Sequence, residues 1–134
     1  MLHFSKAKDN EDFFKCLEEK HPDRFTDWKI TIVFYCAYHL VKALAEKKGV
    51  QIGKDHHEIH GNIKNPCNTR GTMQISRWAW QSYHALYNYS KDARYKVIDS
   101  YEGQVEDEKK DLTDALYHLG KIKEYIKSQG MEVE

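Results

Sequence analysis

Apolar residues recur every three or four positions in four segments of the chain, which is the period of an amphipathic α-helix. The segments run from about residue 5 to 20, 28 to 48, 72 to 94 and 105 to 128. None of them shows the strict alternation of apolar and polar residues that is typical of a half-buried strand. The pattern therefore predicts an all-α fold, an antiparallel up-and-down four-helix bundle in a single domain over residues 1–134.

The segment 28–48 has the most continuous apolar character of the four. A helix that is apolar nearly all round is usually the most buried helix of its bundle. Thr26 or Asp27 is the expected N-cap, and Gly49 is expected to end the helix. We therefore expect this helix to be the centre of the core. Its apolar face consists of Ile30, Val33, Ala37, Leu40, Val41 and Leu44, and its apolar flanks include Ile32, Phe34 and Cys36.

The other three helices are expected to bury narrower faces. In the first helix this face holds Phe13, Phe14 and Leu17. In the third helix it holds Ile75, Trp78, Ala79, Leu86, Tyr89 and Ala93. In the fourth helix it is a seam of Val105, Leu112, Ala115, Leu116, Leu119, Ile122 and Ile126. Gly120 lies inside the fourth helix, where glycine costs about 1 kcal/mol relative to alanine. We therefore expect Gly120 to permit the close approach of another helix.

Residues 49–71 separate the second and third helices and carry no sustained period. Four of the seven glycines and one of the two prolines fall in this stretch, and both residue types interrupt regular structure. The sequence therefore predicts an irregular loop between these two helices, with a short helical turn around residues 55–63.

The charges are balanced in number but not in position. The 134 residues include 21 basic and 21 acidic side chains, and this zero net charge argues against a protein that coats DNA non-specifically. Residues 54–96, however, hold seven basic and three acidic side chains and four of the eight histidines, whereas residues 97–134 hold five basic and ten acidic ones. The basic middle of the chain therefore permits a focused site for a phosphate-bearing ligand.

Cysteine usage and hydropathy indicate the cellular compartment in which the protein is expected. Cys16, Cys36 and Cys67 are odd in number and widely spaced, which excludes a disulfide framework and a CxxC zinc site. The first ten residues contain no apolar signal region, and the apolar stretch from Ile30 to Ala45 is too short and too polar to span a membrane. We therefore expect a cytoplasmic protein with no membrane partner.

Arg77 and His84 are the first candidate for chemistry. Seven residues separate them, so they lie two turns apart on one face of the third helix. An arginine can hold a phosphate or stabilise developing negative charge, and a histidine can move the proton of a ribose 2′-hydroxyl. Together they suit metal-independent cleavage of RNA. The alternative is a solvated polar stripe, which would comprise Arg77, Gln81, His84, Asn88, Lys91 and Tyr95.

Aromatic side chains surround this stripe. Trp80, Tyr83 and Tyr87 flank it and could stack on bases beside Lys91 and Arg94, or could form a dimer interface, where Trp and Tyr are enriched. Tyr95 completes this group of candidate binding residues.

His39 lies at the edge of the apolar face of the second helix. Its imidazole could contact a ligand, or its hydrogen bonds could be satisfied by a neighbouring hydroxyl or carbonyl.

A histidine-rich segment is the third candidate. His56 and His60 are four residues apart, so a helix would point both imidazoles the same way, and His57 lies between them. A metal bound there would need a further ligand, such as His39 or His84. The alternative is a polar surface loop that is rich in histidine.

Several of these features together resemble small prokaryotic HEPN-type proteins. They are Asp27-Trp28, the run Tyr35–His39, the His56-His57 loop and the run Leu86–Tyr95, followed by a long final helix. The resemblance covers the chain from about Trp28 to Ile126. It implies an up-and-down helical bundle that commonly dimerises.

The resemblance also implies a function. Some HEPN proteins are metal-independent ribonucleases, including toxins and antiviral effectors, whereas others bind nucleotides, nucleic acids or partner proteins. Their signature is an arginine followed after four to six residues by a histidine, which Arg77 and His84 match. Trp78 stands where a polar residue often follows the arginine. Two such motifs usually face each other across a dimer.

The sequence therefore predicts a HEPN-like RNA- or nucleotide-binding module. Its enzymatic form would be a metal-independent ribonuclease with a composite site at a homodimer interface, and whether the chain is an enzyme stays open. One alternative is a non-enzymatic module for dimerisation or protein interaction, and another is a metal-binding bundle that uses the histidine-rich loop. No cofactor is expected.

Overall fold

The protein is mostly helical in a computed structural model that describes residues 2–53, 58–60, 63–64, 73–95 and 101–132. The side chains of residues 64, 95 and 101–106 are outside this description. The four long helices are α1 (Leu2–Lys20), α2 (Thr26–Lys48), α4 (Arg77–Tyr95) and α5 (Tyr101–Ser128). They correspond to the four segments with helical period, so the all-α prediction is confirmed at this level.

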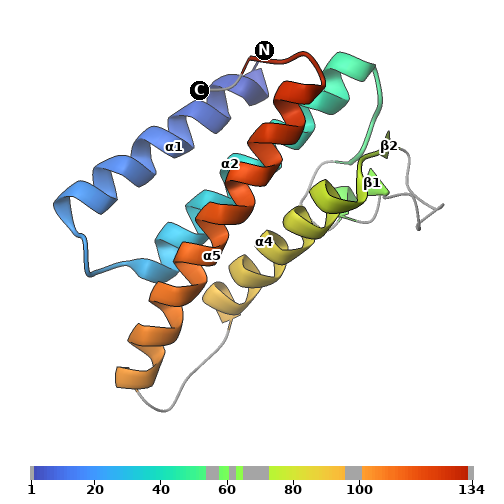
Figure 1. Ribbon diagram of the computed structural model, residues 1–134. Helices are drawn as coiled ribbons and strands as arrows, with labels where there is room; N and C mark the ends of the chain where they lie inside the picture. The colour runs from blue at the N-terminus through green and yellow to red at the C-terminus, as the bar shows by residue number, and fades with distance from the viewer. Residues whose placement is uncertain (1, 54–57, 61–62, 65–72, 96–100, 133–134) are drawn as a thin grey trace.

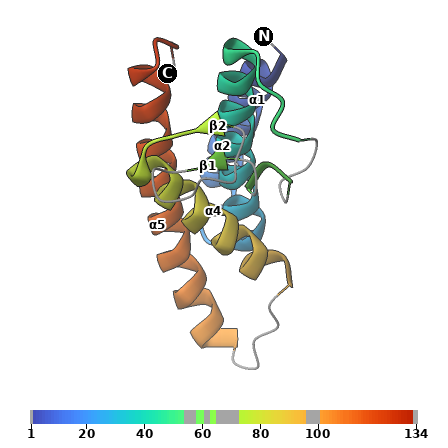
Figure 2. The ribbon, with the colours of Figure 1, turned by 90° about the vertical axis from the view of Figure 1, so that its right-hand side faces the viewer.

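Helix α2 is the element on which the other long helices pack. It contacts α1, α4 and α5, and α4 and α5 also contact each other. Consecutive long helices run in opposite directions, and the start of α1 lies at the same end of the molecule as the end of α5 (Figure 1; Figure 2). None of the described helices combines the length and the apolarity that a membrane-spanning segment needs.

A small β-sheet precedes α4, and the sequence pattern did not predict it. Strand β1 (Ile63–Lys64) pairs in parallel with β2 (Met73–Gln74). Two residues are too few for an alternating pattern to be recognised. Because residues 73–74 form this strand, the third long helix begins at Arg77 rather than near residue 72. Of the predicted turn around 55–63, residues 58–60 are helical.

The burial of α2 confirms its predicted central place. Every residue of the predicted apolar face is buried, and so are Ile32, Phe34 and Cys36. The predicted end is also correct, since Gly49 has a φ of 70° and its N–H bonds back to Glu46. The predicted N-cap is wrong, because Phe25 takes that position at a φ of 61° with no side-chain cap bond, and Thr26 is already helical.

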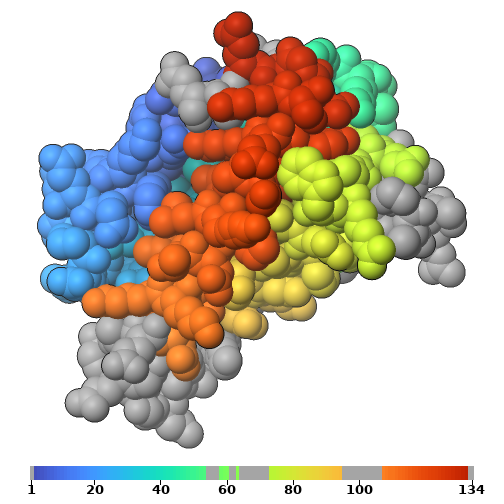
Figure 3. Space-filling view, viewed as in Figure 1, coloured from blue at the N-terminus to red at the C-terminus, as the bar shows by residue number. Residues whose placement is uncertain are grey.

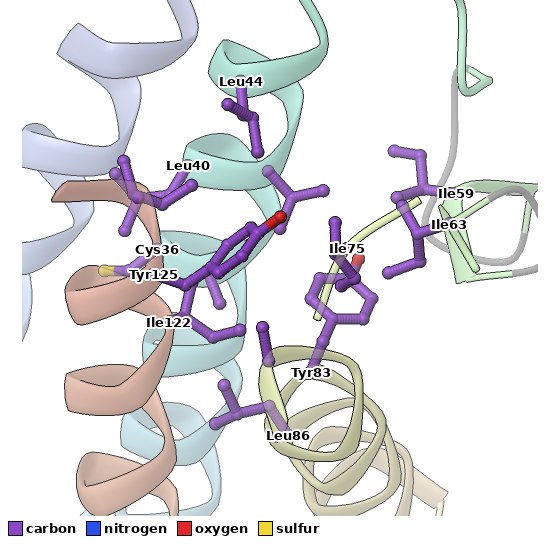
Figure 4. Close-up of a cluster of buried hydrophobic side chains, with 14 of the residues drawn as sticks. Cys36, Leu40, Leu44, Ile59, Ile63, Ile75, Tyr83, Leu86, Ile122 and Tyr125 are labelled. Carbon is purple, nitrogen blue, oxygen red and sulfur yellow. The ribbon is translucent and has the colours of Figure 1, made fainter. Parts of the chain in front are cut away.

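The core lies between α2, α4 and α5 (Figure 4). Cys36, Leu40 and Leu44 come from α2, and Ile122 and Tyr125 come from α5. Three isoleucines near the β-sheet, Ile59, Ile63 and Ile75, close one side, beside Tyr83 and Leu86 of α4. The predicted seam of α5 is buried at Ala115, Leu119, Ile122 and Ile126 and partly buried at Leu112, whereas Leu116 is 39% exposed. The side chain of Val105 lies outside the described residues.

Of the face predicted for the third long helix, Ile75, Ala79 and Leu86 are buried and Tyr89 and Ala93 are partly buried, but the buried face also includes a side of α4 that the sequence did not predict. Trp78 is 43% exposed, whereas Tyr83 is fully buried and Tyr87 nearly so. The two tyrosine rings pack on Phe34 of α2, with centroid distances of 5.7 and 6.0 Å. Small side chains, Ser82 and Ser90, complete the buried face. Trp78 was predicted to be buried because of its hydrophobicity and its position in the helical period. Neither of these shows that the ring of Phe34 packs on the side of α4 that carries Tyr83 and Tyr87.

Two further predictions about packing are wrong. Phe13 of α1 is 54% exposed and does not share the burial of Phe14 and Leu17. A Cβ at Gly120 would meet no heavy atom within 4 Å, so this glycine does not permit a close helix contact in the monomer.

Candidate functional site

The candidate site lies on α4, where the helix carries Arg77, His84 and Lys91 along one face. Arg77 and Lys91 are exposed, and His84 is partly buried. The seven-residue spacing puts Arg77 and His84 about 10 Å apart along the helix axis. They therefore share a face of the helix, two turns apart, as the sequence predicted.

The ring of His84 is bonded at both nitrogens. His60 Nε2 lies 2.7 Å from His84 Nδ1, and Asn88 Nδ2 lies 3.2 Å from His84 Nε2. The ring also stacks on Trp80 at 4.9 Å between centroids, with an angle of 6° between planes, and on His60 at 4.9 Å. His84 is therefore held in one orientation by three residues, His60, Trp80 and Asn88, of which His60 contributes both a hydrogen bond and a ring contact.

His60 joins the 58–60 segment to α4 through an aromatic stack. Its ring lies 4.5 Å from that of Tyr87, with only 10° between the planes. Trp80 and Tyr83 lie at 6.0 and 6.5 Å from the same ring. The cluster of His60, Trp80, Tyr83, His84 and Tyr87 thus combines two imidazoles with three aromatic rings.

The candidate aromatic residues differ in how much surface they offer. Tyr83 is fully buried and Tyr87 nearly so, and their rings pack in the core instead of facing a ligand. Trp80 is partly buried. Among the described residues, Trp80 Nε1 and the Tyr83 hydroxyl have no hydrogen-bond partner. Lys91 lies over the Tyr87 ring, with 5.9 Å from Nζ to the centroid.

The candidate residues at the end of α4 lie apart from His84. Arg94 donates a hydrogen bond from Nη1 to Ser90 Oγ at 2.7 Å. Together with Trp28 at the start of α2 it lines a small cavity of about 320 Å³. The side chain of Tyr95 is outside the described residues.

His39 pairs with a histidine of α1 and does not join the α4 site. Its Nδ1 lies 3.0 Å from His3 Nδ1, and His3 Nε2 lies 3.2 Å from a carboxylate oxygen of Glu46. Burial, followed by the nearby His3 and two lysines, lowers the pKa of His39 to about 4. A neutral, paired His39 fits a role in docking α1 onto α2.

The metal hypothesis gains no support from the described residues. His56 and His57 lie outside them, and His60 pairs with His84. Within the ranges that the structure describes, no group of three or more His, Cys, Asp or Glu side chains could hold a metal ion. The sequence did suggest His84 as a companion of His60, although for metal binding.

A second concave region lies between α1 and α5, and the sequence did not predict it. The cavity measures about 950 Å³ and has Cys36 and Leu40 of α2 among its lining residues. The space-filling view shows α1 and α5 on either side of it (Figure 3). Glu11 and Lys123 form an ion pair across it at 2.5 Å. Burial alone would raise the pKa of Glu11, but its bonds to Lys123 and Lys15 lower it.

Cys36 offers no reactive thiol to this cavity, since burial raises its pKa to about 12. The cavity walls otherwise mix apolar side chains with the charges of three lysines and two glutamates. No reacting group comparable to His84 faces it among these lining residues. The residues on α4 are therefore the stronger candidate site.

No family model, no curated protein and no solved structure matches the chain. The arrangement of side chains on α4 is therefore the basis for any functional assignment. The sequence did not predict that Asn88 would be a hydrogen-bonding partner of His84, or that His3 would be one of His39. Asn88 follows His84 by one helical turn, whereas nothing in the sequence links His3 to His39, 36 residues away.

Proposed function

We propose that the chain is a HEPN-like RNA-binding module, a four-helix bundle that dimerises and cleaves RNA without a metal ion. Arg77 and His84 are the catalytic residues. The observation that carries this proposal is the partly buried His84, which is held at both ring nitrogens on a helix face that also carries the exposed Arg77 and Lys91.

The chemistry is a transesterification within the RNA. Nε2 of His84 takes the proton of a ribose 2′-hydroxyl, and the 2′-oxygen attacks the adjacent phosphorus. The bond from phosphorus to the 5′-oxygen breaks, and the leaving oxygen takes a proton from a general acid. Arg77 stabilises the negative charge that builds up on the phosphate oxygens. The products are a 2′,3′-cyclic phosphate and a 5′-hydroxyl.

A homodimer completes this site. Within one chain, Arg77 and His84 are separated by about 10 Å along the helix, which is long for two groups that act on one phosphate. If two copies of α4 cross in antiparallel orientation at a two-fold axis, Arg77 of one copy lies near His84 of the other. The leaving 5′-oxygen takes its proton from a water molecule, which serves as the general acid. The free thiols of Cys16 and Cys36 fit a reducing cytoplasm, where RNA is available.

The test is cleavage of a labelled single-stranded RNA in the presence of EDTA. We expect His84→Ala to lower the cleavage rate at least about 100-fold and Arg77→Ala by about 100-fold or more. Lys20→Ala is the control, because Lys20 is an exposed basic residue at the end of α1 and outside the candidate site, and it should change the rate less than about threefold. Wild-type protein that neither cleaves nor binds RNA would overturn the proposal.

A non-enzymatic dimerisation module is the second candidate function. Trp28 is 62% exposed and Trp78 43% exposed, and exposed tryptophans favour a protein interface. In this case the dimer would form while RNA remained intact in the EDTA assay. A chain that stays monomeric in light scattering at high concentration would count against both functions.

A further inference from the structure

We propose that His60 is a positioning residue that fixes the tautomer of His84, so that the Nε2 lone pair of His84 faces the substrate side. This inference rests on the proposed function, because it names a residue that prepares the proposed base. His60 comes from the 58–60 segment, far in the sequence from the Arg77–His84 motif.

The hydrogen-bond pattern determines where the protons lie. The side-chain nitrogen of Asn88 can only donate, so His84 Nε2, 3.2 Å away, must accept. A neutral His84 then carries its proton on Nδ1 and donates it to His60 Nε2 at 2.7 Å. His60 in turn carries its own proton on Nδ1. Each donor and acceptor in this chain follows from the one before it.

The protein holds His60 firmly enough for this role. Its ring stacks on Tyr87, and Tyr87 is itself packed on Phe34 in the core. The preceding residue, Ile59, is fully buried, which anchors the backbone of this short segment. The position of His60 is therefore set by the core and not by solvent-exposed contacts.

The chain just before this segment is also tied to α2. Lys42 Nζ donates a hydrogen bond to the carbonyl oxygen of Gly53 at 3.0 Å. Gly53 has a φ of 115°, and a Cβ on it would lie 2.5 Å from Cβ of Glu58. Only glycine therefore allows the backbone to pass so close to Glu58, two residues before His60.

The hydrogen bond to His60 orients the ring of His84 and also stabilises the positive charge that this ring acquires. A proton taken from a 2′-hydroxyl goes to His84 Nε2 and makes the ring a cation. His60 accepts the Nδ1–H of that cation, as a carboxylate does in a catalytic triad, but as a neutral group. The hydroxyl of the substrate takes the place that Asn88 occupies in the free protein, because both are donors to the same lone pair.

Nuclear magnetic resonance of the full-length, nitrogen-15-labelled protein tests the assignment without any need for activity. At a pH where both rings are neutral, we expect the His84 signals of a protonated Nδ1 and an unprotonated Nε2. His60→Phe keeps a ring on Tyr87 but removes the acceptor, and should move His84 toward the Nε2–H tautomer. His60→Gln restores an acceptor and should restore the Nδ1–H tautomer.

Asn88→Ala is the matched control on the other side of the ring. It removes the donor to Nε2 and should leave the Nδ1–H tautomer in place, because the exposed amide of Asn88 can turn to present either its nitrogen or its oxygen and so follows the tautomer that His60 sets. In the EDTA cleavage assay, His60→Phe should lower kcat about tenfold with little change in KM, and His60→Gln should recover most of it. Should His60→Phe fail to fold, the wild-type tautomer and the His60→Gln variant still decide the question.

Three results would overturn this assignment. They are a wild-type His84 protonated at Nε2, a tautomer that does not respond to His60→Phe, and signals of both rings that shift on addition of zinc alone, which would mark a metal site. The expected tautomers in a protein that does not cleave RNA would instead refute the proposed function and leave the assignment of His60 intact.

Discussion

Removing the hydroxyl of Tyr83 should stabilise the protein. The Tyr83 side chain is fully buried beside Ile75 and Ile63 (Figure 4), and its hydroxyl has no hydrogen-bond partner among the described residues. Burial raises the pKa of this hydroxyl, because the surroundings offer an anion no compensation. Tyr83→Phe keeps the ring, and with it the contact to Phe34.

The size of the effect follows from two opposing contributions. Burying a hydroxyl without a partner costs about 1–3 kcal/mol relative to water. Taking away the oxygen leaves a void of roughly 10–15 Å³, which costs only about 0.3 kcal/mol at 24 cal/mol per Å³. We therefore expect Tyr83→Phe to raise the free energy of unfolding by about 1 kcal/mol. For a domain of this size, that corresponds to a Tm increase of about 3–5 °C.

Tyr125→Phe provides the matched comparison in the same core. Tyr125 is also buried, but its hydroxyl accepts a hydrogen bond from the backbone N–H of Ser76. Its removal should lower the free energy of unfolding by about 1 kcal/mol, since the amide loses its partner. Urea unfolding followed by circular dichroism gives both values, and equal m-values would show that the unfolded states are comparable.

The reasoning would be refuted if Tyr83→Phe lost about 1 kcal/mol or more. That result would mean that the Tyr83 hydroxyl is hydrogen-bonded in solution. The same loss in Tyr83→Phe and Tyr125→Phe would show that the two hydroxyls do not differ in the way the structure describes.

Three further predictions follow from the packing and the charges. Gly120→Ala should raise the free energy of unfolding by about 0.5–1 kcal/mol, because a Cβ there meets no atom within 4 Å, and thermal unfolding measures it. Lys123→Ala should lower it by about 1–2 kcal/mol, since the mostly buried Glu11 loses the closer of its two lysine partners among the described residues and keeps the exposed Lys15, whereas Lys123→Ala combined with Glu11→Gln should recover part of this loss. The pKa of His39 is about 4 in the fold and 6.5 unfolded, so the unfolded state binds more protons between these values. Stability should therefore be complete above pH 6.5 and fall by about 1 kcal/mol, after allowance for partial exposure, as the pH drops toward 4, a slope that His39→Gln should reduce.

The pattern of apolar residues was sufficient to predict which residues are buried in a helix that is buried on most of its surface. For α2, every apolar position expected in the core is buried, because any rotation of such a helix gives the same answer. Helix α4 carries aromatic residues on several faces, so its orientation depends on the surface that α2 offers. Phe34 supplies that surface, and the period of α4 contains no information about it.

The candidate site shows the same division between local and distant information. The two-turn spacing of Arg77 and His84 can be read from the sequence, because a helix fixes it. The contact between His60 and His84 joins residues that are 24 positions apart and depends on a short segment held by Ile59 and Gly53. No periodicity covers that segment, so the sequence could propose His60 only as a metal ligand in a histidine-rich loop, with His39 or His84 as a further ligand.

The most direct measurement of the proposed function is the chemical nature of the RNA ends after incubation with the protein in EDTA. Attack by a 2′-hydroxyl that His84 deprotonates predicts 2′,3′-cyclic phosphate and 5′-hydroxyl ends, and predicts that an all-deoxy oligonucleotide of the same sequence stays intact. His84→Ala should remove these products while leaving the helix content unchanged. Intact RNA in the wild-type reaction, cleavage of the DNA strand, or 5′-phosphate ends would contradict the proposed function.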